Sequence, residues 1–485
     1  MLKKTQLFFL IKSMSKAEKR YFKLFVSSTS GDNNYLLLFD EIDNQVEYDE
    51  KSIKKKFAGK AFIKQLHVTK NYLSNLILKS LRNYHSKISK EAELKDLQRN
   101  VEILLKRELF QQCLFNVEKG ILIAEQYEKW PDLLSFLEIK RTILRNKKGT
   151  SAALDELNQI NKLEQSVLNK LMHTSRYWDL TVNMFSNFSE PEKLESNSLL
   201  QNEKLADSFQ AKMLYHYAWQ AVHFTKNNLQ ETRKTMEKVI FSWEENEHQI
   251  YENPAAYLTA LNNLVGIALQ AKQYEYAEHM IYKIRRVPIR YGLKSNNPIA
   301  VKAMLHSYNV ELEMYRDTRQ ADRGIEVIPK VREFLEDKSL DRPKSYELLL
   351  YYQFSSLHYF KENYEEALKY LNIILAGKYA NTRDDIMSYA HLSFLVIHFE
   401  LGNMILLRYA VESCRRFLKK KRDLQDFEKT LLSFFSKLST VPKAEYKDHF
   451  KNLKSGLFAG LSEKEKNNIL DYLNFEEWIE NNLNK

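Results

Sequence analysis

One stretch of the sequence, Ser345 to Lys378, constrains the fold more than any other. It reads as two helices joined by a polar break at Lys361 to Asn363, with the small Ser355 where a second helix must approach closely. Apolar residues of the second helix recur at steps of three and four and so share one face: Tyr364, Ala367, Leu371 and Ile374. The stretch therefore predicts a pair of packed antiparallel helices.

The same unit can be traced along the chain by the small or short residue of its second helix. The equivalent positions are Thr232, Ala277, Gly324, Ala367 and Ala410, separated by 45, 47, 43 and 43 residues. A single helix pair cannot bury its apolar face alone, so repeated pairs must stack on one another. We predict stacked helix pairs over residues 96–425.

A Tyr-x-x-Ala signature at Tyr274/Ala277 and Tyr364/Ala367 makes these units resemble tetratricopeptide repeats, and Gly402-Asn403 resembles the interhelix turn of that family. The period exceeds the family's usual repeat of about 34 residues, and a period in the forties also suits HEAT-type repeats. The resemblance implies an all-α, right-handed α-solenoid whose concave face binds a peptide or protein segment.

Composition agrees with an all-α chain. Only 11 Gly and 8 Pro occur among 485 residues, which excludes most turn-rich β architectures. Cys113 and Cys414 each lie in an apolar helical run, as expected of buried thiols in a reducing compartment. The longest uncharged run, residues 253–271, contains Pro, Thr, Asn and Gln, so we expect no membrane span and a cytoplasmic protein.

Positive charge is concentrated at the start of the chain. Residues 1–90 hold 18 Lys/Arg and 8 Asp/Glu, which leaves 56 and 55 for the remaining residues, and residues 51–90 contain no acid. We predict a basic helical head domain over residues 1–95. At the other end, residues 426–485 lack a clear repeat and are expected to form C-terminal capping helices, because an open solenoid needs a terminal unit with a polar face.

Within the head, Ile63 to Leu76 resembles a DNA-binding helix-turn-helix, although Ile63 and His67 depart from its pattern. The resemblance implies a break near His67, a recognition helix capped by Thr69, and outward-facing residues for a DNA groove. These nucleic-acid-binding candidates are Lys70, Asn71, Ser74, Asn75 and Lys79. Two alternatives remain open: a basic cap with solvated lysines, or a surface for an acidic protein or RNA partner.

The repeat register places a second set of candidates on the concave face of the solenoid. These candidates for binding a peptide or protein partner are Tyr217, Asn262, Asn309, Tyr352 and Tyr359. The sequence contains no Gly-rich phosphate loop, HExxH, CxxC or GxSxG motif, so we expect no enzyme, cofactor, catalytic residue or metal. The sequence favours a non-enzymatic interaction scaffold; the alternative is a DNA-binding transcriptional regulator with a repeat sensor.

Overall fold

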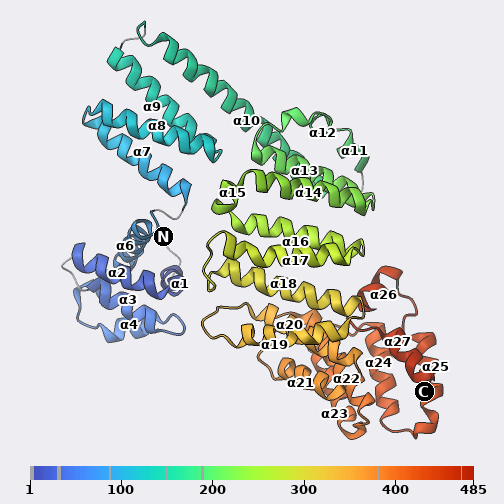
Figure 1. The fold of residues 1–485 in the computed structure, drawn as a ribbon. Coiled ribbons are helices and arrows are strands. Elements are labelled where there is room, and N and C mark those ends of the chain that lie inside the picture. The colour runs from blue at the N-terminus through green and yellow to red at the C-terminus, as the bar shows by residue number, and fades with distance from the viewer. Residues whose placement is uncertain are drawn as a thin grey trace. The chain divides into compact units, whose positions relative to one another are not determined.

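In the computed structural model, the chain is all-α, as the sequence predicts (Figure 1). The structure describes residues 5–29, 34–86, 89–148, 151–186, 191–379, 382–470 and 472–484, and within these ranges it contains no strand. Contacts divide the chain into two units, residues 1–176 with 205–211 and residues 177–204 with 212–485. The division falls inside a helix, α10, and the boundaries predicted near residues 95 and 425 remain predictions.

The first unit begins with six helices that pack around a small apolar core. Their bounds are α1 Gln6–Ser13, α2 Lys16–Thr29, α3 Asn34–Asn44, α4 Glu50–Lys56, α5 Ala61–Lys64 and α6 Leu66–Tyr84. Phe22 of α2, Phe39 of α3 and Leu73 of α6 are fully buried together because each helix presents apolar residues at helical spacing.

Long antiparallel helices continue the first unit: α7 Lys90–Lys106, α8 Phe110–Gln126, α9 Trp130–Lys148 and α10 Leu154–Ser186. Helices α8 and α9 approach closely at Gly120, where a Cβ atom would lie 2.4 Å from the ring of the buried Phe136. Glycine is therefore required at this position by packing, although it is a poor helix former.

The second unit is built mainly of successive helix pairs that lie side by side (Figure 1). The pairs are α13 Phe209–Thr225 with α14 Leu229–Glu245, α16 Pro254–Gln270 with α17 Tyr274–Arg290, α18 Pro298–Asp317 with α19 Ala321–Glu336, α20 Lys344–Phe360 with α21 Tyr364–Leu375, and α22 Asp384–Glu400 with α23 Met404–Lys421. Three short helices, α11 Pro191–Glu195, α12 Ser198–Gln201 and α15 Glu247–Glu252, complete this region. We call the first helix of each pair helix A and the second helix B.

Every pair is joined by the same turn. One residue with φ between +55° and +70° closes each helix A: Asn227, Lys272, Arg319, Glu362 and Gly402. The N–H of this turn residue donates to the carbonyl three residues back, and the next N–H donates to the carbonyl five residues back from itself. This arrangement pairs carbonyls at the helix end that would otherwise lack donors. Its recurrence at intervals of 45, 47, 43 and 40 residues confirms that the pairs repeat.

The turn fixes the register of each helix B and corrects one predicted position. Thr232, Ala277, Gly324 and Ala367 each lie five residues after their turn residue and are buried, as predicted. In the last pair the equivalent residue is the fully buried Leu407, not Ala410, which lies one helical turn later. The prediction was wrong there because the last interval is 40 residues, shorter than the others.

The chain ends in four further helices, α24 Asp426–Leu438, α25 Tyr446–Gly456, α26 Glu463–Leu470 and α27 Phe475–Asn484. Trp478 of α27 is buried among Phe399, Phe434, Phe435 and Phe450, with ring centroids 5.1 to 5.9 Å from its own. None of the helices in the described part of the chain combines the length and apolarity needed to cross a membrane.

Candidate binding surfaces

Four of the five predicted groove residues occupy one equivalent position on successive A helices. Tyr217, Asn262, Asn309 and Tyr352 each lie ten residues before the turn residue of their pair. Because α18 contacts both α16 and α20, Asn262, Asn309 and Tyr352 form a row across these three helices, and Tyr217 holds the equivalent position on α13. We call them the inner row. The fifth candidate, Tyr359, lies two helical turns after Tyr352 on α20 and is half-buried.

The row is closed at one end by the C-terminal part of the chain. Tyr352 is only 2% exposed, and its hydroxyl donates to the carbonyl of Tyr472 at 3.0 Å. Tyr472 stacks on Tyr389 of α22 with ring centroids 4.0 Å apart, and Glu477 forms an ion pair with Arg319 beside it. The expectation that Tyr352 lines an open groove is therefore wrong, because the residues around Tyr472 cover it.

Two amides of the inner row have unsatisfied oxygens. Asn309 is 8% exposed, and its Oδ1 has no hydrogen-bond partner among the described residues. The Oδ1 of the half-buried Asn262, one repeat earlier, also lacks a partner in this part of the chain. A buried carbonyl without a donor costs about 1–3 kcal/mol. Both oxygens are shielded from solvent, so each side chain would have to rotate toward the surface before a ligand could supply an N–H group.

Two of the five nucleic-acid-binding candidates face inward. Lys70 is 9% exposed; its Nζ lies 3.0 Å from Oε2 of Glu50 and donates to the hydroxyl of Tyr48 at 2.9 Å. Ser74 is also buried on α6. The expected outward placement of Lys70 and Ser74 is wrong. The break between α5 and α6 lies at Gln65, two residues before His67, and α6 packs against the other helices with the face that carries Leu66, Leu73 and Ile77.

The break at Gln65 also changes the role predicted for Thr69. Helix α6 begins at Leu66, and Thr69 lies inside its first turn, where its hydroxyl donates to the carbonyl of Gln65 at 3.2 Å. Thr69 therefore does not cap the helix, and that prediction was wrong. Asn71 is half-buried, whereas Asn75 and Lys79 are exposed as expected.

The exposed face of α6 contains residues that the sequence analysis missed. Residues at spacings of four and three form one solvent-facing stripe, which we call the α6 face: Val68, Tyr72, Asn75, Lys79 and Arg82. Tyr72 is 50% exposed and stacks on Tyr35 with ring centroids 4.7 Å apart. The buried stripe on the other side of α6 includes Leu66, Leu73 and Ile77.

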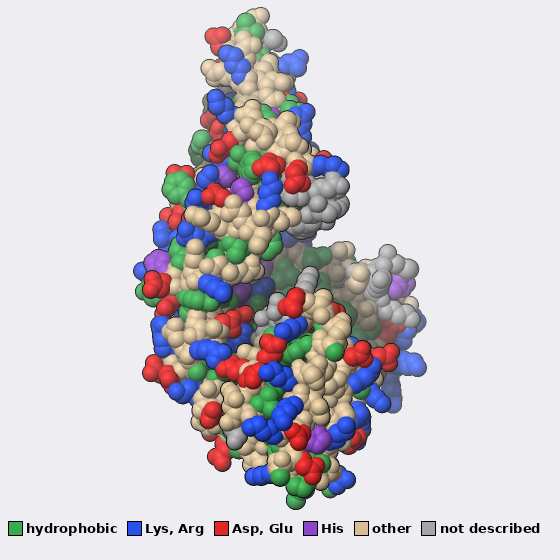
Figure 2. All heavy atoms as spheres, turned by 90° about the vertical axis from the view of Figure 1, so that its right-hand side faces the viewer, with side chains coloured by type: hydrophobic (Ala, Val, Ile, Leu, Met, Phe, Trp, Pro, Cys, Tyr) green, Lys and Arg blue, Asp and Glu red, His purple; other side chains and the backbone are tan. Residues whose placement is uncertain are grey.

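Charged side chains of both signs are dispersed over the surface drawn in Figure 2, and several titratable side chains are buried or partly buried. Lys/Arg and Asp/Glu side chains are intermixed over the face drawn in Figure 2. Burial lowers the pKa of His216 and of His391 to about 4. Cys113 and Cys414 are buried free thiols, and burial raises the pKa of both. Within the described ranges, no group of three or more His, Cys, Asp or Glu residues is placed to hold a metal ion.

Comparison with known proteins adds no further assignment. No protein-family model matches the chain, and neither the curated proteins nor the solved structures compared with it gave a match.

Proposed function

We propose that this protein is a non-enzymatic, cytoplasmic interaction scaffold whose inner row binds an extended segment of another protein. The observation that carries the proposal is the pair of unsatisfied oxygens on Asn262 and Asn309, at equivalent positions one repeat apart. An extended peptide presents backbone N–H groups along its length, and the two amides would accept from them by rotating their buried oxygens toward the surface. In this proposal, the helix pairs form a right-handed, tetratricopeptide-like solenoid with a basic head and a C-terminal cap.

The covered end of the row limits where the peptide would lie. Tyr352 is covered by residues near Tyr472, so the proposed site extends over α13, α16 and α18. Tyr217, half-buried on α13, provides an aromatic surface at the other end of this site. Aromatic side chains next to hydrogen-bonding groups are typical of peptide-binding surfaces, because rings supply contact area at low entropic cost.

Leucine substitutions in the 485-residue chain test the proposal. Asn309→Leu removes an unpaired buried oxygen, so we expect the free protein to become more stable by about 1 kcal/mol. The double variant Asn262→Leu/Asn309→Leu should no longer cross-link, through α16 and α18, to the partner protein that the wild type captures. Asn263→Leu, on the exposed neighbouring position of α16, is the matched control and should leave cross-linking unchanged. Equal cross-linking by the double variant and by Asn263→Leu would exclude the inner row as the site.

A specific observation also supports the alternative of DNA binding. The α6 face exposes Tyr72, Asn75, Lys79 and Arg82, and residues 51–90 contain no acidic side chain. Lysine and arginine pair with phosphates, and asparagine can bond to base edges in the major groove. In this alternative the protein is a transcriptional regulator whose basic helices bind DNA and whose repeats sense a partner.

Fluorescence anisotropy with a DNA duplex at low and physiological salt tests this alternative. Lys79→Glu combined with Arg82→Glu should abolish binding, since each reversal removes a phosphate contact and adds repulsion. Lys70→Met is the matched control: this lysine is buried against Glu50, so its loss should leave duplex affinity unchanged. Absence of binding by the wild-type protein at low salt would remove the DNA-binding alternative.

A further inference from the structure

A second surface of the repeat region has the properties of a docking site, and it is independent of the inner row. A cleft of about 470 Å³ lies along α17, the B helix of the second pair. Six of the residues that line it are Tyr257, Tyr282, Lys283, Arg286, Arg290 and Tyr291. His279, Val287 and Ile289 complete the lining, which contains no acidic side chain. The cleft is therefore aromatic and cationic.

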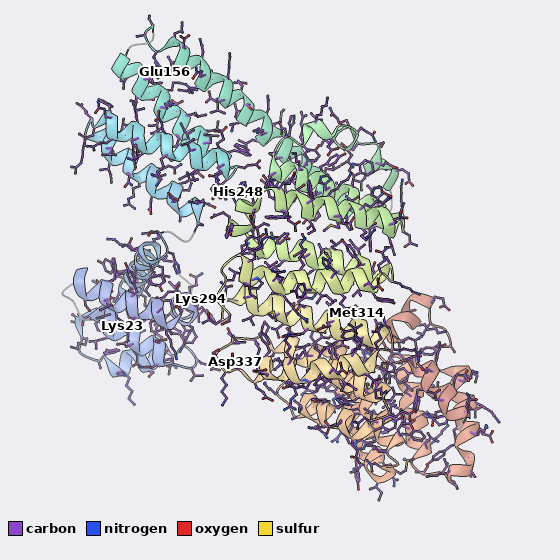
Figure 3. The ribbon with its side chains drawn as sticks, in the orientation of Figure 1. Lys23, Glu156, His248, Lys294, Met314 and Asp337 are labelled. Carbon is purple, nitrogen blue, oxygen red and sulfur yellow. The ribbon has the colours of Figure 1, made fainter. Side chains whose placement is uncertain are left out.

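The sequence of α17 explains why these groups gather on one side. The apolar positions Ala277, Ile281 and Ile284 are buried against neighbouring helices. The opposite positions, spaced three and four residues apart, carry Tyr282 and Arg286 into solvent. The helix ends at Arg290, and Lys294, which Figure 3 labels, lies in the loop that follows it.

Two of the cations are held in place by carboxylates beside the cleft. Nζ of Lys283 lies 2.5 Å from Oε1 of Glu244, and Arg290 lies 2.9 Å from Oε1 of Glu247. The hydroxyl of the buried Tyr257 also donates to Glu244 at 2.5 Å. These pairs fix the base of the cleft, and they neutralise the charges of Lys283 and Arg290.

Arg286 is in a different situation. Its guanidinium lies 5.7 Å from the ring centre of Tyr282, and no carboxylate in the described ranges forms an ion pair with it. Apolar side chains surround it in solvent: Ile289 is 82% exposed and Tyr282 is 58% exposed. An unpaired arginine beside exposed apolar groups is typical of binding hot spots, because it can form a bidentate pair once water is excluded.

We propose that this cleft docks an acidic segment of a partner protein, with a carboxylate on Arg286 and an apolar side chain against Ile289 and Tyr282. Arg286 is the lining cation without a carboxylate partner in the described ranges, so its charge favours an anionic partner. With Lys283 and Arg290 paired to Glu244 and Glu247, one cation that is unpaired among the described residues remains in the lining, which suits a single carboxylate next to an apolar residue better than the continuous phosphates of a nucleic acid. The observations favour a protein partner over RNA or DNA.

The test uses the 485-residue chain and fluorescein-labelled short peptides that carry a single Glu next to Leu or Phe. Anisotropy should show binding to these peptides and not to peptides with Lys in place of Glu. Arg286→Glu should weaken binding at least about tenfold, since it replaces attraction by repulsion at the centre of the cleft. Ile289→Ala, at a side chain too exposed to affect folding, should also weaken it.

Two controls make the result decisive. Lys330→Glu reverses an exposed lysine on the next B helix, α19, and should leave affinity within about twofold. Asn262→Leu with Asn309→Leu should also leave it unchanged, so that failure of the inner row and failure of the cleft are distinguishable. Equal effects of Arg286→Glu and Lys330→Glu, or Arg286-dependent binding of a single-stranded RNA but not of the peptides, would overturn the proposal.

Discussion

Replacing Gly120 by alanine probes a close approach between α8 and α9 in the first unit. The added Cβ would lie 2.4 to 2.7 Å from three ring carbons of Phe136, whereas carbon atoms in contact are normally about 3.5–4.0 Å apart. The ring is fully buried, so it must move by about 1 Å within a packed core. Overpacking of this kind costs about 1–3 kcal/mol.

The higher helix propensity of alanine opposes this packing cost and reduces the net change in the free energy of unfolding. Alanine is a better helix former than glycine by about 1 kcal/mol in a helix interior. We therefore expect Gly120→Ala to destabilise α8 and α9 by up to about 2 kcal/mol net. Gly266→Ala is the matched control: Gly266 is exposed on α16 with no atom within 4 Å of the added Cβ, so this change should stabilise its helix by about 1 kcal/mol.

Hydrogen exchange followed by mass spectrometry measures each effect in its own helices, which avoids assuming that both units unfold together. Exchange in α8 and α9 should accelerate in Gly120→Ala, and exchange in α16 should slow in Gly266→Ala. Adding Phe136→Leu to Gly120→Ala should cost less than the sum of the single changes, because the two sites share one contact. Slower exchange in α8 for Gly120→Ala would refute the reasoning from packing.

Three further predictions concern the turn, a histidine and the buried lysine. Lys272→Gly should stabilise the second unit by about 0.5–1 kcal/mol in urea unfolding, since relief of a positive φ exceeds the added entropy of the unfolded chain; Gly402→Ala should have the opposite sign. Because burial lowers the pKa of His391 to about 4, the unfolded chain binds the proton first, so stability should fall between about pH 6.5 and 4; His391→Phe should flatten that dependence in thermal unfolding. Lys70→Glu should destabilise the N-terminal helices by about 3 kcal/mol, measured by exchange in α6, because it places a second carboxylate next to Glu50.

The helix pairs were predictable because their signal is local and repeated. Apolar residues at helical spacing recur along the chain, as does a small or short residue in four of the five B helices, and each occurrence supports the others. The phase of α6 was not predictable in the same way. Its buried stripe includes the polar Lys70 and Ser74, which interrupt the apolar pattern. The apolar Val68 and the aromatic Tyr72 are exposed, so a similar pattern also occurs on the opposite face. A polar side chain is stable in such a stripe only because a partner such as Glu50 faces it, and a sequence pattern does not show that partner.

The covered position of Tyr352 has a different cause, because its partner is distant in sequence. The hydroxyl of Tyr352 reaches the carbonyl of Tyr472, 120 residues later, and no periodic pattern connects the two. Tyr352→Phe removes this hydrogen bond but keeps the ring, so it should destabilise the second unit by about 1 kcal/mol, measured by urea unfolding. If the proposed peptide site extends only over α13, α16 and α18, the variant should still cross-link the partner as the wild type does. Loss of cross-linking in Tyr352→Phe without loss of stability would show instead that the partner displaces the residues around Tyr472 and uses the whole row.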